Sequence, residues 1–118
     1  MTLAPVVRVA ALSAAIAIAA GAFGAHAVIG QAQEWLRTGA WYQLAHAIAA
    51  VVIVRLDPRI AWTLLGGAAV FAFSLYLMAL GAPRWFGAIT PLGGLALIIG
   101  WLWLAFGRGP ASVRAIDD

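Results

Sequence analysis

The sequence predicts an all-α integral membrane protein, a four-helix antiparallel bundle, and three observations support this prediction. Of its 118 residues, 65% are hydrophobic and only 9% are charged, whereas roughly a quarter are charged in a soluble domain. The mean hydropathy of the chain is +1.01. The apolar residues form four long runs, of the kind that span a membrane as helices. These expected spans of a single domain, residues 1–118, cover residues 6–29, 39–54, 60–81 and 88–107.

The first run ends in the stretch GAFGAHAVIG, residues 21–30, which also resembles the cleavage site of a secretory signal. We expect a retained helix instead, because the run is longer than a typical signal core. Small residues recur along one face of it, and such faces let membrane helices approach closely. The glycines expected to pack helices together in this way are Gly21, Gly24, Gly93, Gly94 and Gly100, with Gly66 and Gly67 in the same role.

The second run is the shortest, about 24 Å at 1.5 Å per residue, so it either extends back to Trp35 or lies slightly sunk among its neighbours. The third run follows Asp57 and Pro58, a capping residue and a favoured first helical residue. Thr90 and Pro91 repeat that pattern inside the fourth run. Helix four then either begins at Pro91, with WFGAI as an interfacial stretch, or begins earlier and kinks there. We favour the first alternative.

Short connections make sequential helices antiparallel neighbours, which leaves the orientation to be read from the arginines. All seven basic residues are Arg. Five belong to the N-terminus, the second connection and the C-terminus, against two in the other connections, which predicts that both termini are cytoplasmic. The five are Arg8, Arg55, Arg59, Arg108 and Arg114, and the two are Arg37 and Arg84. An aromatic belt is expected at each boundary: Trp35, Trp41 and Trp85 outside, and Trp62, Trp101 and Trp103 inside.

Polar residues inside the spans are expected to collect in the outer half of the membrane. Side chains of this kind usually face the bundle interior and pair there. The candidate cluster consists of His26, Tyr42, Gln43, His46, Ser74, Tyr76 and Thr90. Two interpretations stay open: a set of hydrogen bonds that fixes how the helices pack, or a binding or proton-handling pocket that opens outward.

Several functional classes find little support. The arginines are scattered singly, so no nucleic-acid partner is expected. Catalysis of the Ser-His-acid type needs a carboxylate beside the histidine, and only Glu34 lies on the same predicted side as His26. No catalytic residue, metal site or cofactor is therefore assigned. The TPLGG stretch, residues 90–94, could attract an anion at a helix start, but we favour a cap followed by packing glycines.

The motifs GAFGAH, YQLAHA, FSLY and TPLGG, taken in this order, resemble the small membrane-protein family called domain of unknown function 423 (DUF423), which includes proteins similar to transmembrane protein 256. The resemblance covers about Gly21 to Trp101 and implies a four-span protein of the bacterial cytoplasmic membrane. Phe73 departs from it, since a glycine commonly precedes the serine in this family.

The chain is too small, and its connections too short, to form a separate soluble domain. We therefore expect a non-enzymatic assembly or accessory protein in the lipid bilayer, in contact with other membrane subunits or with a second copy. The alternative is a small transporter or ligand-binding protein that uses the polar cluster as an outward-facing pocket.

Overall fold

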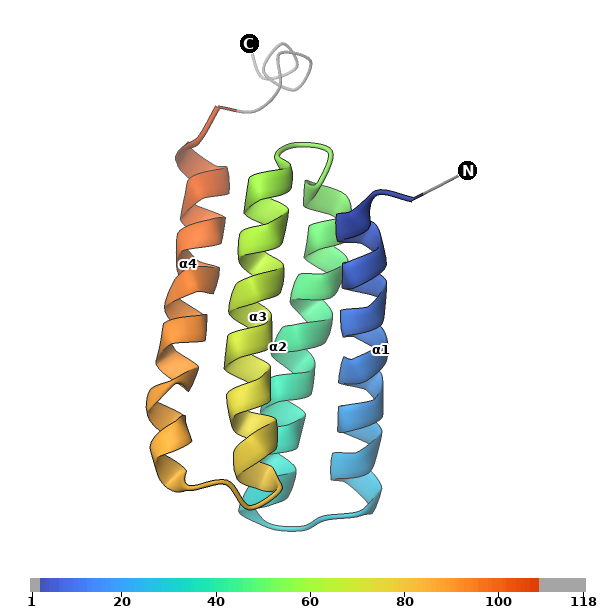
Figure 1. The fold of residues 1–118 in the computed structure, drawn as a ribbon, viewed down its shortest axis with the longest axis vertical. Coiled ribbons are helices and arrows are strands. Elements are labelled where there is room, and N and C mark those ends of the chain that lie inside the picture. The colour runs from blue at the N-terminus through green and yellow to red at the C-terminus, as the bar shows by residue number, and fades with distance from the viewer. Residues whose placement is uncertain (1–2, 109–118) are drawn as a thin grey trace.

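The computed structural model describes residues 3–108, which fold into four antiparallel helices (Figure 1). The α-helices are α1 (Pro5–His26), α2 (Gln31–Ile53), α3 (Pro58–Ala79) and α4 (Thr90–Phe106), and a short 3-10 helix, η1 (Arg84–Ala88), precedes α4. No strand occurs among the described residues. Both ends of the described chain and the α2–α3 connection lie at one end of the bundle, and the other two connections lie at the opposite end.

Proline starts α3 and α4 as the sequence predicts. The Asp57 side chain caps α3 by accepting a 2.9 Å hydrogen bond from the backbone N–H of Arg59, while Pro58 needs no acceptor at the first helical position. Helix α4 begins at Thr90 with Pro91 in its first turn. The preceding WFGAI stretch belongs mainly to η1, so α4 starts at the Thr-Pro pair and is not a longer helix kinked there.

Helix α2 is longer than expected, because it begins at Gln31 and not near residue 39. The chain turns at Gly30, whose φ of 69° is a conformation that glycine adopts without strain. The first turns of α2 are polar, which is why hydropathy alone assigns them to a connection. Helices α1, α3 and the η1–α4 segment are each long and apolar enough to cross a membrane, with mean hydropathies of 2.0, 1.8 and 1.9, and α2 falls outside that set.

The four helices pack in chain order and leave one side of the bundle open. Helix α2 packs on α1 and α3, and α4 packs on α3, whereas α1 and α3 touch only weakly. Within the described residues, α4 makes no close backbone contact with α1 or α2. The result is a flattened body of 51 × 33 × 20 Å with α1 and α4 at its two edges (Figure 1).

Glycines set the closest helix contacts. A Cβ atom at Gly24 would lie 2.8 Å from the Cβ of Leu36, and one at Gly100 would lie 2.7 Å from the Cδ2 of Leu64. Gly93 lies directly against the backbone of Phe71 and Gly67, where a Cβ would be 2.7 Å from the Gly67 carbonyl oxygen. These three glycines thus sit where a larger residue would push two helices apart.

The other expected packing glycines are less confined. A Cβ at Gly21 would meet the Cβ of Ala40 at 3.5 Å, and one at Gly94 would meet the ring of Phe71 at 3.8 Å, both ordinary contact distances. At Gly66 there is no atom within 4 Å, so the expectation that it packs against a neighbour was wrong: it lies on the outer side of α3.

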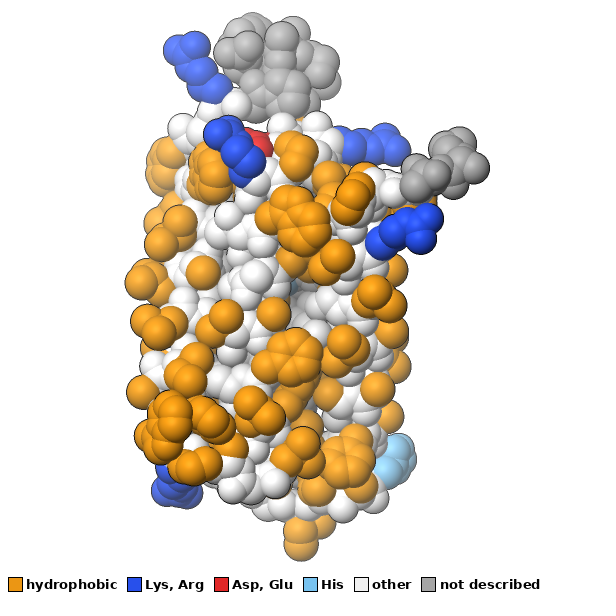
Figure 2. Space-filling model, viewed as in Figure 1, with side chains coloured by type: hydrophobic (Ala, Val, Ile, Leu, Met, Phe, Trp, Pro, Cys, Tyr) orange, Lys and Arg blue, Asp and Glu red, His pale blue; other side chains and the backbone are white. Residues whose placement is uncertain are grey.

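Charged side chains keep to the two ends of the molecule. Figure 2 shows arginines at both ends of the visible face and hydrophobic side chains over the length between them. Trp41, which was expected at a membrane boundary, belongs to α2. It is the eleventh residue of α2 and therefore about 15 Å along that helix. Arg114 lies outside the described residues.

Candidate functional site

A chain of two hydrogen bonds joins α1, α2 and α3 through Gln43. The amide nitrogen of Gln43 donates to the Ser13 hydroxyl oxygen at 3.1 Å, and the Tyr76 phenol donates to the amide oxygen of Gln43 at 2.7 Å. Gln43 is only 1% exposed and Tyr76 7%. An unpaired polar group would be costly at such depth in an apolar bundle. Gln43 is therefore the central polar residue of the protein.

Gly39 makes the Gln43–Tyr76 bond possible. It lies one turn before Gln43 on the same face of α2, and the ring of Tyr76 packs directly on its backbone. A Cβ at this position would be 2.6 Å from the ring atom Cε1 of Tyr76. Neither Gly39 nor Ser13 belonged to the cluster predicted from the sequence. Gly39 could have been found from its spacing, because it lies four residues before Gln43 and therefore on the same face of a helix.

A second link connects α3 to the start of α4. The hydroxyl oxygens of Ser74 and Thr90 are 2.6 Å apart, and Ser74 also donates to the carbonyl oxygen of Phe71 at 2.9 Å. Since Ser74 donates to that carbonyl, the Thr90 hydroxyl supplies the hydrogen between the two side chains. Ser74 is buried, and Thr90 is partly buried. This pair fixes the first turn of α4 against α3.

A third link joins α2 to α4 through His46. The ring nitrogen Nδ1 lies 2.7 Å from the carbonyl oxygen of Tyr42, and the indole N–H of Trp101 donates to Nε2 at 3.1 Å. A carbonyl only accepts and an indole N–H only donates, so the ring carries its hydrogen on Nδ1 and is neutral. The rings of Tyr42 and Phe71 lie 4.2 Å apart beside this link.

His26 does not join any of these links. It is the last residue of α1, and its side chain is exposed. Glu34, the acid that the sequence placed near it, lies instead in the first turns of α2 and is 3.5 Å from Arg37. The neighbouring Gln33 donates to the carbonyl oxygen of Gly24 at 3.0 Å and so ties the end of α1 to α2.

The predicted cluster is therefore divided into separate links at different depths. His46 lies in the half of the bundle opposite to the one expected: it is the sixteenth of the 23 residues of α2, towards the end that holds the termini. The physical reason is the early start of α2 at Gln31, which shifts every residue of this helix relative to the others. Ser74, Tyr76 and Thr90 lie towards the opposite end, and Gln43 lies near the middle.

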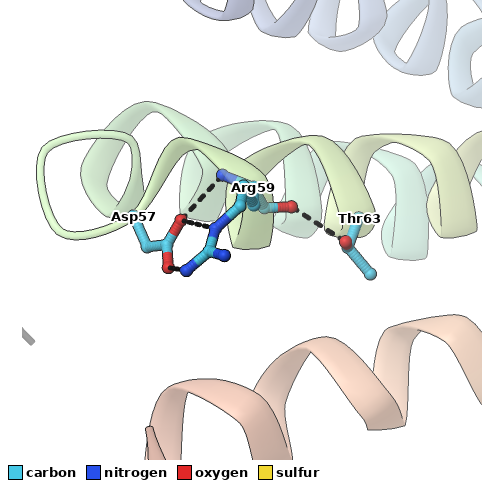
Figure 3. A network of polar contacts seen from close by, with 3 residues as sticks. All are labelled: Asp57, Arg59 and Thr63. Atoms are coloured by element: carbon cyan, nitrogen blue, oxygen red, sulfur yellow. Dashed lines mark hydrogen bonds and ion pairs between the residues drawn. The ribbon is translucent and has the colours of Figure 1, made fainter. Parts of the chain in front are cut away.

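A further polar network stands at the start of α3 (Figure 3). The Arg59 guanidinium donates to both carboxylate oxygens of Asp57, at 3.1 and 2.9 Å, and stands over the ring of Trp103 on α4, 5.1 Å from its centre. These hydrogen bonds from Arg59 hold the pKa of Asp57 below its ordinary value. Thr63 donates back to the Arg59 carbonyl oxygen at 2.8 Å.

Two grooves open on the sides of the bundle. One, of about 290 Å³, runs between α1 and α2 and includes Gly21, Ala40 and Arg37 in its walls. The other, of about 180 Å³, lies over α1 and α3 and reaches Ser13 and Gln43. Among the described residues, each buried polar side-chain atom has a hydrogen-bond partner. The polar residues thus link helices, and the grooves are mainly apolar.

The sequence is similar to that of a known family of proteins. Residues 20–94 match the model of the family described as "Protein of unknown function (DUF423)". The chain is similar to the UPF0382 membrane protein YwdK of Bacillus subtilis, at 34% identity over 80% of this chain and 87% of the relative. It is also similar to the UPF0382 inner membrane protein YgdD of Escherichia coli, at 36% identity over 83% of this chain and 84% of the relative.

No solved structure matches the chain. The family match covers most of the chain, including α2 and α3, and the relatives are matched over most of their own length. Together with the apolar helices, these relatives establish an integral membrane protein. The chain belongs to the DUF423 family of membrane proteins.

Proposed function

We propose that the protein is a non-enzymatic accessory component that docks a membrane helix of a partner protein on its open side, between α1 and α4. The observation that supports this most is the missing contact between these two helices. An ordinary four-helix bundle closes around one core. Here α3 is left with a side that neither α1 nor α4 covers fully, although α3 is the most buried of the three apolar spans.

The surface offered on this side is apolar, with a groove between α1 and α3. Leu12 of α1 is 66% exposed and Phe73 of α3 is 40% exposed, and both line the groove over Ser13 and Gln43. Membrane helices associate by close packing and occasional hydrogen bonds. A partner helix seated here would gain both, since its side chains would fill the groove and reach the Ser13 hydroxyl.

The internal hydrogen bonds support an accessory role over a transport pocket. Gln43, Tyr76 and Ser74 are bonded across helices, so they hold the bundle in one arrangement. His46 is bonded on both ring nitrogens and lies far from His26, which removes the geometry that an outward-facing histidine pocket needs.

In this proposal all four helices span the bacterial inner membrane and the termini face the cytoplasm. Helix α2 has 23 residues, about 34 Å, and packs between two apolar spans, so it crosses the bilayer with them. The end with the termini holds most of the arginines, as the cytoplasmic side of membrane proteins does. These arginines are Arg8, Arg55, Arg59 and Arg108, against Arg37 and Arg84 at the other end.

Site-directed photo-crosslinking in native membranes tests the docking surface. A photoreactive residue replaces Leu12 or Phe73 on the open side, or Ile48 of α2 as the control, whose exposure of 58% lies between those of the other two. We expect one discrete adduct with a second protein from the first two positions and none from Ile48. Equal labelling from all three positions, no adduct, or an adduct only at twice the chain mass of 12.3 kDa would contradict the proposal.

A further inference from the structure

The groove between α1 and α2 combines an apolar floor with a cation at one end. Its walls contain Gly21 and Ala25 of α1 and Ala40 and Leu44 of α2. The small side chains at Gly21, Ala25 and Ala40 leave a groove of about 290 Å³ along the helix pair. Ile18 and Trp41 flank it and are 62% and 68% exposed, so the groove opens outward towards the surrounding lipid.

Arg37 lies at the end of this groove, and its charge is only weakly compensated. Its guanidinium is 3.5 Å from the Glu34 carboxylate, and both side chains are 58% exposed. At that distance and exposure the ion pair contributes little. Within residues 3–108 no other carboxylate forms an ion pair with Arg37. The guanidinium therefore keeps donors for an oxyanion, and a phosphate or carboxylate is what its planar fork fits best.

Arg37 can reach a lipid phosphate, because its long side chain can carry the charge from within the span towards the headgroups. It is six residues after Gln31, about 9 Å along α2 from the end of the bundle, and Leu44 lies about 10 Å deeper. One leaflet of the hydrocarbon core is about 15 Å thick. The groove thus runs from the polar first turns of α2 into the acyl region.

We propose that this groove binds an anionic phospholipid, from the leaflet on the side of the α1–α2 connection. The phosphate bonds to Arg37, and one acyl chain lies against Gly21 and Ala40. A transmembrane helix is a poorer occupant, because an apolar helix over Arg37 would bury its charge without a partner. This inference concerns a different face of α1 from the open side of the bundle and does not depend on the partner helix proposed for that side.

Lipid titration of the purified full-length chain tests the inference. Native mass spectrometry in detergent measures binding of phosphatidylglycerol and, for comparison, zwitterionic phosphatidylcholine. We expect Arg37→Gln to weaken phosphatidylglycerol binding about tenfold, the loss of one charge-assisted bond, and to remove the preference over phosphatidylcholine. Arg84→Gln is the matched control, since Arg84 is exposed at the same end and does not line the groove.

A second pair of variants tests the acyl part of the site. Gly21→Leu fills the groove, and Gly66→Leu places the same side chain in open space on α3. We expect weaker binding only from Gly21→Leu, with circular dichroism unchanged. Equal losses from Arg37→Gln and Arg84→Gln, equal affinity for both lipids, or unchanged binding after Gly21→Leu would overturn the inference. If Gly21→Leu unfolds, the Arg37 and Arg84 comparison alone decides.

Discussion

The Tyr76 phenol on α3 donates a 2.7 Å hydrogen bond to the side-chain oxygen of Gln43 on α2. The bond crosses the most extensive helix contact of the molecule, and the other end of the same amide bonds to Ser13 on α1. One side chain therefore aligns three helices. Its removal should affect the whole bundle and not a single helix.

We expect Gln43→Leu to lower the free energy of unfolding by about 1–3 kcal/mol, because the buried Tyr76 hydroxyl loses its acceptor. Combining it with Tyr76→Phe should recover part of that loss, since the stranded hydroxyl is then gone as well. Unfolding by sodium dodecyl sulfate in mixed micelles, measured on both single variants and the double variant, gives the coupling energy. Strictly additive losses would show that the two side chains do not interact.

Replacing Gly93 by Ala should lower stability by about 1–3 kcal/mol, because its Cβ would meet the backbone of Phe71 and Gly67 and force α4 away from α3. Gly66→Ala is the matched control on α3. There the new methyl group has open space, and alanine is the better helix former, so stability should stay equal or rise. Equal effects of the two changes would contradict the close contact at Gly93. Thermal unfolding in detergent measures both.

Gly39→Ala should act through Tyr76. The added methyl group would stand 2.6 Å from the ring and displace it from its place beside Gln43. We therefore expect Gly39→Ala to lower the free energy of unfolding. The loss should be smaller in a Tyr76→Phe background, where the ring is free to shift, and in a Tyr76→Ala background, where no ring can clash. Ultraviolet absorbance or fluorescence of the tyrosines reports the displaced ring. A Gly39→Ala loss that is unchanged in the Tyr76→Ala background would contradict this contact.

The Asp57–Arg59 pair predicts a pH dependence at the start of α3. Hydrogen bonds from Arg59 lower the pKa of Asp57 from its ordinary value of 3.8. A carboxylate with a lowered pKa in the folded state contributes stability above its unfolded pKa, and this contribution is lost as the pH falls through the folded value. Stability should thus drop below about pH 4. Asp57→Asn should flatten that part of the unfolding-against-pH curve, whereas an unchanged curve would exclude Asp57 as its source.

The orientation can be measured directly because the chain has no cysteine. We expect Ile29→Cys, in the exposed α1–α2 connection, to react with a membrane-impermeant thiol reagent added to intact cells. Leu3→Cys, at the end with the termini, should react only after the membrane is opened. The reverse pattern would mean that the arginine distribution does not set the orientation of this protein.

Local signals in the sequence predict where the helices start better than they predict which residues meet. The Asp57-Pro58 and Thr90-Pro91 pairs mark the starts of α3 and α4, because capping and the missing proline N–H are properties of adjacent residues. The start of α2 could not be predicted in this way, because no capping side chain marks it. Its first turns are polar although they are helical, so hydropathy assigns them to a connection, whereas the connection ends at Gly30.

The predicted depths of the candidate site residues on α2 depended on where that helix begins. Gln43 and Tyr76 were both predicted to belong to the cluster, and they form a hydrogen bond, since polar residues in membrane helices usually pair with one another. His26 and His46 were both expected in the outer half of the membrane but lie towards opposite ends of the bundle. Trp101 was taken for a boundary residue, yet its indole N–H bonds to His46. The rotation of a helix about its axis decides such pairings, and periodicity in a uniformly apolar helix does not reveal it.

The order of helix packing has a consequence for how the protein is made. Each helix after the first packs on the one before it in the chain, α2 on α1, α3 on α2 and α4 on α3. During synthesis the N-terminal part of a chain is available first. Every newly inserted helix therefore finds a packing partner already in the membrane, and the bundle can grow by sideways addition without waiting for the chain to be finished.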